Sequence, residues 1–398
     1  MRFVITILLG SIIILHPVHG CKLWAICTIN GSTIPTMSTD EHILVQDELT
    51  SFYAQSESMA HGWAFLSYPD TNHDSLTVWH RSANPAIQDS TLYWSIVDSM
   101  LTYETSSLAV GHLRLASSGT DSIPNPHPWL FYQDNKTYSL VHNGTLNKTI
   151  LYNLITQDST DISWLIDNPP NTFGNGDWME GGWSSVVDSE LLMLFIMQKI
   201  NETDNVFLGL QSALWLLVDQ GVLPIQLNTI FSDGDSLFVY GGRDGLSIAS
   251  SDEHFVVMTS PATHESAGSM NWDGLSQNEM VIINESGITF YPNFATVEPD
   301  PFVPLPSDFL LLPPYPNPFN STVTIPYELN IGPPMTISIY SLKGESLFET
   351  VISRDISTTG EIEWMPYKDQ QKLLSTGVYI VKAASGEFTQ TQKILFIK

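Results

Sequence analysis

A proline-dense stretch near residue 300 divides this 398-residue chain into two bodies of different composition. It runs Glu298-Pro-Asp-Pro-Phe-Val-Pro-Leu-Pro306, and proline at this density makes a semi-rigid spacer with no core of its own. Residues 21–304 carry 7 Lys and Arg against 33 Asp and Glu, a net charge of −26. Residues 305–398 carry 7 against 9, a net charge of −2. We therefore expect two separately folded domains, joined by a Pro-rich linker at residues 295–310.

The shortage of cations excludes two classes of partner. The whole chain has 15 Lys and Arg and a net charge of −27, and its few cations do not cluster. Binding to nucleic acid or to an anionic membrane surface needs clustered Lys and Arg, so we expect neither. A hydrophobic content of 43% indicates folded domains and not an acidic disordered chain.

The chain begins with the pattern of a secretory signal. Met1-Arg2 is followed by 13 mostly apolar residues at 3–15, and Val18 and Gly20 stand three residues and one residue before Cys21. A positive start, a short apolar core and these two residues predict a signal peptide over residues 1–20. The apolar run is too short for a membrane span, and no later stretch reaches span length. We expect an exported protein with no transmembrane segment.

Cleavage after Gly20 makes Cys21 the first residue, and this cysteine has three interpretations. It is the lipid-modified residue of a lipoprotein, an unremarkable exported residue, or a nucleophile whose own α-amine acts as base, since that amine titrates near neutrality. The segment Cys21 to Cys27 alternates like a strand, with both cysteines on one face. Extended, the two sulfurs lie roughly 20 Å apart, too far for a disulfide.

Four short blocks between residues 61 and 190 carry the candidate chemistry. Arg114 ends an apolar strand and can clamp a carboxylate, or it forms a structural ion pair. Asn143-Gly144 can donate to an oxyanion, or it is a plain hairpin turn. Asp188 opens an apolar helix as an N-cap or as a ligand for an ammonium group. The blocks are His61–Phe65, Val110–Gly119, Asn125–Pro128 with Tyr138–Gly144, and Asp188–Glu190.

Histidines are frequent in these blocks, but their spacing does not indicate a metal site. The four are His61, His112, His127 and His142. None forms an H-x-x-x-H or H-x-H pair, and no cysteine cluster joins them. We therefore predict a site with no metal and no cofactor.

Taken in this order behind a terminal cysteine, the blocks resemble the class II glutamine amidotransferase domain in its stand-alone bacterial form. The resemblance covers residues 21–294 and implies the α+β fold of N-terminal nucleophile hydrolases, a four-layer αββα sandwich. The local pattern agrees, with apolar helical runs at 190–200 and 205–219 and a loop at 168–183. Strands are expected at 23–29, 62–67, 108–115, 138–142, 236–240, 255–259 and 280–283.

The resemblance also implies a role for each matching residue. Cys21 would be the nucleophile, and Asn143 with the Gly144 N–H would form the oxyanion hole. The substrate-binding residues would be Arg114 and Ser117 at the α-carboxylate, Asp188 at the α-ammonium, and Gly62 and Trp63 along the glutamine pocket. His127 and His142 would brace the turns.

Two departures from the family pattern bear on the substrate. Lys22 replaces a small residue after the nucleophile, and the block after Arg114 reads Leu-Ala-Ser-Ser-Gly. We expect hydrolysis of a glutamine-like or γ-glutamyl amide through a thioester, without a fixed preference for glutamine. The alternatives are a non-catalytic surface binding module on the same fold, and an N-acyl amidase or peptidase of the same superfamily.

The C-terminal body, residues 311–398, has short alternating strands typical of a seven-strand β-sandwich. Tyr315-Pro-Asn-Pro-Phe-Asn320, Ile339–Gly344, Gly377-Val-Tyr379 and the terminal Lys398 resemble the immunoglobulin-like C-terminal sorting domain of type IX secretion cargo. A carbohydrate-binding sandwich is the alternative. The resemblance implies type IX machinery as a partner and the surface or surroundings of a Gram-negative bacterium as the location. Such cargo needs a releasable N-terminus, which favours a free Cys21 over a lipidated one.

Overall fold

The computed structural model describes residues 20–69, 78–117, 125–242, 245–299, 309–312, 314–329, 334–352, 358–368, 372–385 and 388–398. The predicted signal peptide, except Gly20, and most of the predicted linker lie outside these residues. The chain divides into two compact units, an N-terminal unit that ends at Pro299 and a C-terminal unit over Asp300–Lys398.

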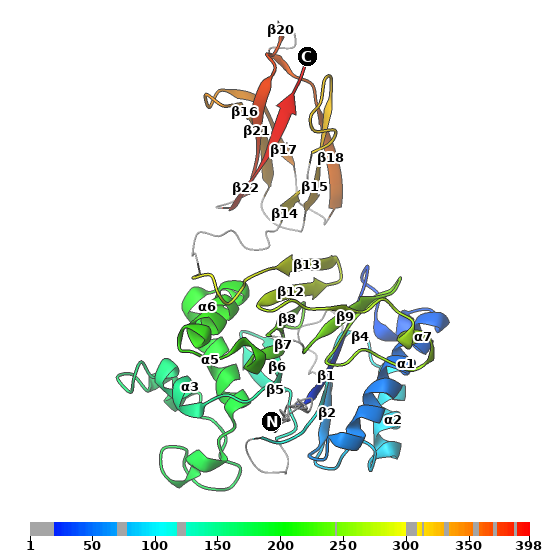
Figure 1. The fold of residues 1–398 in the computed structure, drawn as a ribbon, viewed down its shortest axis with the longest axis vertical. Coiled ribbons are helices and arrows are strands. Elements are labelled where there is room, and N and C mark those ends of the chain that lie inside the picture. The colour runs from blue at the N-terminus through cyan, green and yellow to red at the C-terminus, as the bar shows by residue number, and fades with distance from the viewer. Residues whose placement is uncertain are drawn as a thin grey trace, which may run out of the picture. The chain divides into compact units, whose positions relative to one another are not determined.

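Two antiparallel sheets form the centre of the N-terminal unit (Figure 1). Sheet A has seven strands in the order β11 (Asp273–Gly274), β9 (Ser247–Ser250), β10 (His254–Met258), β1 (Lys22–Thr28), β4 (Ser106–Leu113), β2 (Trp63–Pro69) and β3 (Val78–Ser82). Sheet B has six, in the order β13 (Gly287–Tyr291), β12 (Glu279–Asn284), β8 (Leu237–Gly241), β7 (Asn228–Ser232), β6 (Lys136–Asn143) and β5 (Trp129–Gln133).

The side chains of β1 alternate between two separate cores, as the sequence predicts. Leu23, Ala25 and Cys27 pack between the two sheets, against Val141 and Ile230 of sheet B. The intervening residues of β1 pack on the opposite face of sheet A, beneath the helices. A strand buried on both faces can be apolar throughout, and this explains the continuous apolar character of β1.

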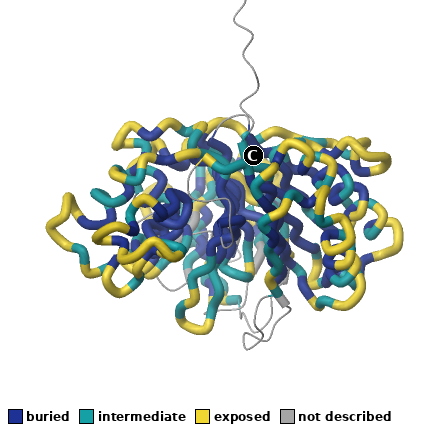
Figure 2. The backbone as a smooth tube through the Cα atoms, turned by 90° about the horizontal axis from the view of Figure 1, so that it is seen from below, coloured by how far each residue is buried: buried dark blue, intermediate teal, exposed yellow. Residues whose placement is uncertain are grey.

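Helices cover the outer face of each sheet, and the unit therefore has four layers, α, β, β and α (Figure 1). This confirms the predicted fold class. Figure 2 shows the buried segments gathered in the middle of the unit and the exposed turns around its rim.

Outside sheet A lie α1 (Thr39–Gln55), α2 (Ser90–Thr102) and α7 (Glu265–Gly268). On the side of sheet B are α3 (Lys148–Ile155), α4 (Ser163–Asp167), α5 (Asp188–Thr203) and α6 (Val206–Asp219). Single 3-10 turns are η1 (Ile34–Thr36), η2 (Ser56–Ser58), η3 (Gly181–Ser185) and η4 (Pro224–Gln226).

The two helices that the sequence predicted both form, and local signals set where they begin. Helix α5 starts at Asp188 and is buried on nearly every side, as its apolar sequence requires. Helix α6 begins after Asn205, whose side chain accepts a hydrogen bond from the Leu208 N–H and caps the helix. Helices α1 and α2 were not among the predicted elements.

The C-terminal unit is the predicted β-sandwich. Seven of its described strands form two sheets around one apolar core that includes Phe319, Trp364 and Phe396. One sheet has the order β14 (Phe309–Leu311), β15 (Val323–Leu329) and β18 (Thr358–Trp364). The other has the order β17 (Ser346–Ile352), β16 (Met335–Ser341), β21 (Gly377–Ser385) and β22 (Phe388–Phe396), and a small hairpin joins β19 (Tyr367–Lys368) to β20 (Lys372–Leu373).

Candidate active site

The candidate nucleophile and the candidate carboxylate anchor lie side by side at one edge of sheet A. Strand β1 pairs antiparallel with β4, and Lys22 stands opposite Leu113, so Cys21 and Arg114 extend the same pair of strands by one step. The Arg114 N–H donates to the Gly62 carbonyl at 2.8 Å, and the His61 N–H donates to the Arg114 carbonyl at 3.1 Å. The main chain of Arg114 is thus fixed by the ladder to β2, and its side chain is buried.

The environment of Cys21 favours the protonated thiol. Its Sγ lies 3.6 Å from the Leu115 carbonyl oxygen, within hydrogen-bond range for a thiol. Burial raises the pKa of the Cys21 thiol above its ordinary value, and the nearby Asp188 carboxylate adds to this, while the Leu115 contact and the Arg114 charge oppose it. A nucleophile with a raised pKa needs a base close by.

Sheet B brings the candidate oxyanion hole to the same edge. Strand β6 ends at Asn143, and residues 143–146 form what we call the oxyanion turn. A Cβ atom on Gly20 would overlap the Asn143 side-chain oxygen, so the residue before Cys21 lies directly against this amide. Gly144 also has no room for a side chain, because a Cβ there would meet the Gln226 carbonyl and the His142 ring.

Asp188 and Ser117 both hold the oxyanion turn. The Leu146 N–H donates to Asp188 Oδ2 at 2.7 Å, and the Thr145 hydroxyl donates to the Ser117 hydroxyl at 2.7 Å. Val187, and not Asp188, occupies the N-cap position of α5. The buried Asp188 side chain therefore fastens the turn to the helix and does not cap the helix.

Of the two predicted pocket residues, Gly62 lies just before β2, and Trp63 points toward the helices outside sheet A. Gly62 has a φ of +110°, and a Cβ there would overlap the Ser82 carbonyl and the Pro126 ring, so only glycine fits. The Trp63 indole belongs to the core beneath the helices and donates to Asp89 at 3.3 Å. Leu23, in contrast, packs between the sheets. The alternation of side chains thus places the indole on the face opposite Leu23, and the pocket prediction does not extend to the Trp63 side chain.

Three of the four block histidines, His112, His127 and His142, are buried near the end of β6. The rings of His112 and His127 stack with centroids 3.8 Å apart, and His127 Nε2 accepts a hydrogen bond from the His142 N–H at 3.3 Å. Burial lowers the pKa of His112 and His142 and takes that of His127 to about 3. Neutral rings next to the strand that ends at Asn143 fit the bracing role implied by the family resemblance.

Several contacts at this edge involve Thr259, Ser260 and Gln226, which the sequence analysis did not propose as site residues. The Leu23 N–H donates to Thr259 Oγ1 at 2.6 Å, and Lys22 Nζ donates to Ser260 Oγ at 3.2 Å. These contacts tie the start of β1 to the end of β10. Gln226 of η4 contacts the oxyanion turn at Thr145. No local motif marks these residues, because their partners lie about 80 or more residues away in the sequence.

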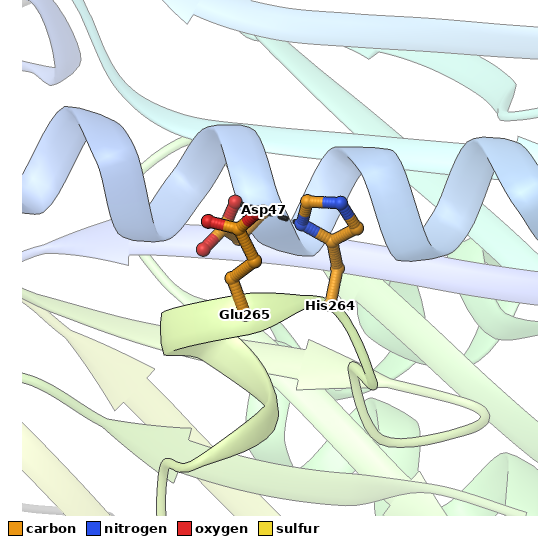
Figure 3. Close-up of side chains that lie close together, drawn as sticks. All are labelled: Asp47, His264 and Glu265. Atoms are coloured by element: carbon orange, nitrogen blue, oxygen red, sulfur yellow. Dashed lines mark hydrogen bonds and ion pairs between the residues drawn. The ribbon is translucent and has the colours of Figure 1, made fainter.

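A separate group of possible cation ligands lies between α1 and α7 and includes none of the block histidines. Asp47, His264 and Glu265 place their ligand atoms within 4.8 Å of one another (Figure 3). Asp47 Oδ1 accepts from His264 Nδ1 at 3.0 Å, and Asp47 Oδ2 accepts from the Ser266 N–H at 2.8 Å. These bonds already attach α7 to α1.

Comparison with known proteins identifies the C-terminal unit. Residues 314–398 match the model of the secretion system C-terminal sorting domain. The C-terminal unit is a secretion sorting domain. It directs the chain to export by type IX secretion, to the cell surface or beyond. Within the described part of the chain, no helix is both long enough and apolar enough to cross a membrane.

The N-terminal unit has more distant relatives. An uncharacterized protein of Methanocaldococcus jannaschii is 22% identical over 305 residues, which cover 69% of this chain and 71% of that protein. Glutamine phosphoribosylpyrophosphate amidotransferase from B. subtilis, in complex with ADP and GMP, is 17% identical with a TM-score of 0.44. A predicted glutamine amidotransferase from Pseudomonas aeruginosa is 15% identical with a TM-score of 0.33, over 68% of this chain and 95% of that one. The match to the B. subtilis enzyme covers 69% of this chain but only 49% of the enzyme, about half its length.

Proposed function

We propose that the mature protein is an exported cysteine amidohydrolase that cleaves a glutamine-like or γ-glutamyl amide through a thioester on Cys21. The observation that carries this proposal is the meeting of two sheets at one edge. Cys21 and Arg114 come from adjacent strands of sheet A, and the oxyanion turn from sheet B lies against the residue before Cys21. Asp188 holds that turn and acts electrostatically on the Cys21 thiol.

Removal of residues 1–20 gives the thiol its base. Once Gly20 is gone, the α-amine of Cys21 is free and takes the thiol proton, which compensates for the raised thiol pKa. Cleavage also clears the position next to the Asn143 side chain that Gly20 occupies. Export and activation would therefore depend on the same cut.

The reaction then has two steps. In the first step, Cys21 Sγ bonds to the amide carbonyl carbon, and the Asn143 amide and the Gly144 N–H donate to the developing oxyanion. The C–N bond then breaks as the α-ammonium of Cys21 gives its proton to the leaving amine. Water next attacks the thioester, releasing the carboxylic acid and restoring the thiol. The resemblance assigns Arg114 to the substrate carboxylate and Asp188 to its ammonium group, which suits an amino-acid amide.

The two cysteines provide the test of the nucleophile. A thiol-reactive glutamine analogue should label Cys21 in the mature protein. It should spare Cys27, which is buried and whose pKa is raised to about 12 by burial. Cys21→Ala should lower hydrolysis by about 10³-fold or more, with Cys27→Ala as the matched control. Retention of activity in Cys21→Ala would refute the mechanism, and a lipid adduct on Cys21 in the intact mass would refute the free nucleophile.

The substrate class is tested by a direct comparison of hydrolysis rates. We expect L-glutamine and γ-glutamyl-p-nitroanilide to be cleaved faster than N-acyl amides and dipeptides, because the roles proposed for Arg114 and Asp188 match the two charges of an amino acid. The reverse order would indicate an N-acyl amidase or peptidase. No labelling of Cys21 and no turnover would indicate a binding module.

A further inference from the structure

We propose that Gln226 is the positioning residue of the oxyanion hole, holding the turn 143–146 so that the Gly144 N–H faces the reacting carbonyl. The inference rests on the proposed function. Gln226 ends the 3-10 turn η4, two residues before β7 of sheet B begins. It is 81 residues from Thr145 and outside every block that the sequence singled out.

The side chain of Gln226 uses both ends of its amide. Its Nε2 donates to the Thr145 carbonyl at 2.6 Å, and its Oε1 accepts from the Leu223 N–H at 3.1 Å. The Leu223 N–H can only donate and the Thr145 carbonyl can only accept, so these two partners fix the orientation of the Gln226 side-chain amide. A group with one donor and one acceptor is required, and a carboxylate does not meet the requirement.

The main chain of Gln226 supports the same turn from a second direction. Its carbonyl accepts from His142 Nε2 at 2.8 Å, and the same carbonyl lies where a Cβ of Gly144 would be. The turn of η4 fixes this carbonyl, because the Gln226 N–H donates to the Leu223 carbonyl at 2.8 Å. Gln226 thus contacts His142, two residues before Gly144, and Thr145, directly after it, and holds the chain on both sides of the Gly144 peptide group.

The turn needs such support because the β-ladder ends before it. Asn143 is the last residue of β6 and pairs with Asn228, so the Gly144 N–H lies beyond the regular hydrogen bonds of sheet B. Asp188 holds the far side at Leu146 and Gln226 holds the middle at Thr145. An oxyanion donor displaced by a fraction of an ångström loses much of its effect on the transition state.

Two near-isosteric variants test the proposal in the full-length mature protein. Gln226→Glu keeps the acceptor for Leu223 but turns a negative oxygen toward the Thr145 carbonyl, and Gln226→Met keeps the length and loses both bonds. We expect kcat for γ-glutamyl-p-nitroanilide to fall by about 10- to 100-fold in Gln226→Glu and less in Gln226→Met, with a smaller change in KM. The matched control is Gln46→Glu, which adds the same charge at an exposed position of α1.

Hydrogen–deuterium exchange of the peptide spanning residues 143–147 gives a second readout that needs no substrate. We expect exchange to accelerate by about tenfold or more in Gln226→Glu and to stay unchanged in Gln46→Glu. If wild-type protein hydrolyses no amide, the proposed function fails and exchange alone decides the role of Gln226. Unchanged exchange, or unchanged kcat with accelerated exchange in an active enzyme, would overturn the positioning role.

Discussion

The two units differ in what they bury. Within its described residues, the C-terminal unit buries a single polar side chain, Ser338, in a core of apolar and aromatic groups. The N-terminal unit buries an arginine, several carboxylates and four histidines. Buried ionisable groups are expensive to keep, and they gather where a protein needs particular charges in particular places. In the N-terminal unit, Arg114 and Asp188 are buried at the candidate site, and a second buried group joins His254 of β10 to carboxylates of α1.

The largest effect should come from the apolar core of the C-terminal unit. Phe396 is fully buried and packs against Phe319 with ring centroids 5.2 Å apart. Phe396→Ala should lower the free energy of unfolding of this unit by about 3–5 kcal/mol, because the cavity adds to the lost burial. Calorimetry should show a lower midpoint temperature for the unfolding transition of the C-terminal unit and an unchanged midpoint for that of the N-terminal unit. Movement of both transitions would mean that the units unfold together.

A pH-dependent effect should appear in the N-terminal unit alone. Burial disfavours a charged His254, but the carboxylates of Glu48 and Glu41, each 2.7 Å away, raise its pKa to about 9. A pKa raised in the folded state gives stability that is complete below the unfolded value near 6.5 and lost as pH rises through 9. We expect a loss on the order of 3 kcal/mol across that range.

Chemical unfolding at pH 7 and pH 9.5 checks this prediction. His254→Gln should flatten the pH dependence, and the C-terminal unit, which contains no histidine, is the internal control. An N-terminal unit as stable at pH 9.5 as at pH 7 would show that His254 is not charged in the folded state.

The next effect separates a functional buried charge from a structural one. Arg114→Leu should raise KM for a γ-glutamyl substrate by about 100-fold through loss of a bidentate contact, with kcat less affected. The KM of Arg114→Lys should lie between those of the wild type and Arg114→Leu, because lysine keeps the positive charge but cannot make the bidentate contact. Steady-state kinetics on both variants decides the matter. An unchanged KM in Arg114→Leu would leave Arg114 as a structural group.

The smallest effect should follow removal of the sorting domain. A chain that ends at Pro299 retains every residue of the candidate site, so kcat/KM should stay within about twofold of the full-length value. Export of the shortened chain should fail, which fractionation of the producing cells would show. A large loss of kcat/KM would mean that the C-terminal unit contributes to the site.

The family resemblance implied the four layers, and the apolar strands and the helices α5 and α6 agreed with it, whereas the β-sandwich was predicted from its short alternating strands. It did not predict α1, because the buried face of that helix includes Glu41, Asp47 and Glu48, and an apolar period cannot reveal a face made of paired carboxylates. Glu41 and Glu48 of that face hold His254, more than 200 residues away in the sequence.

The candidate site stays a prediction, and the structure shows only which of its residues lie near one another. Arg114 and Asp188 reach the edge where Cys21 lies because each stands at the end of a regular element with a recognisable pattern. The side of the sheet that Trp63 faces depends on the register of β2, and a block of five residues does not fix it. Gln226 could not be found because its role depends on a contact across two sequence-distant loops.

The spacing of the two cysteines along β1 has a consequence for redox chemistry outside the cell. Cys27 lies six residues beyond Cys21, roughly 20 Å along an extended strand, and its thiol is buried in the core between the sheets. Cys21 thus has no internal partner with which to form a disulfide. Oxidation of the exported thiol would have to proceed through a sulfenic acid or a mixed disulfide with a small thiol, both of which are reversible. The thiol state of Cys21 would then follow the oxidants and reductants of its surroundings.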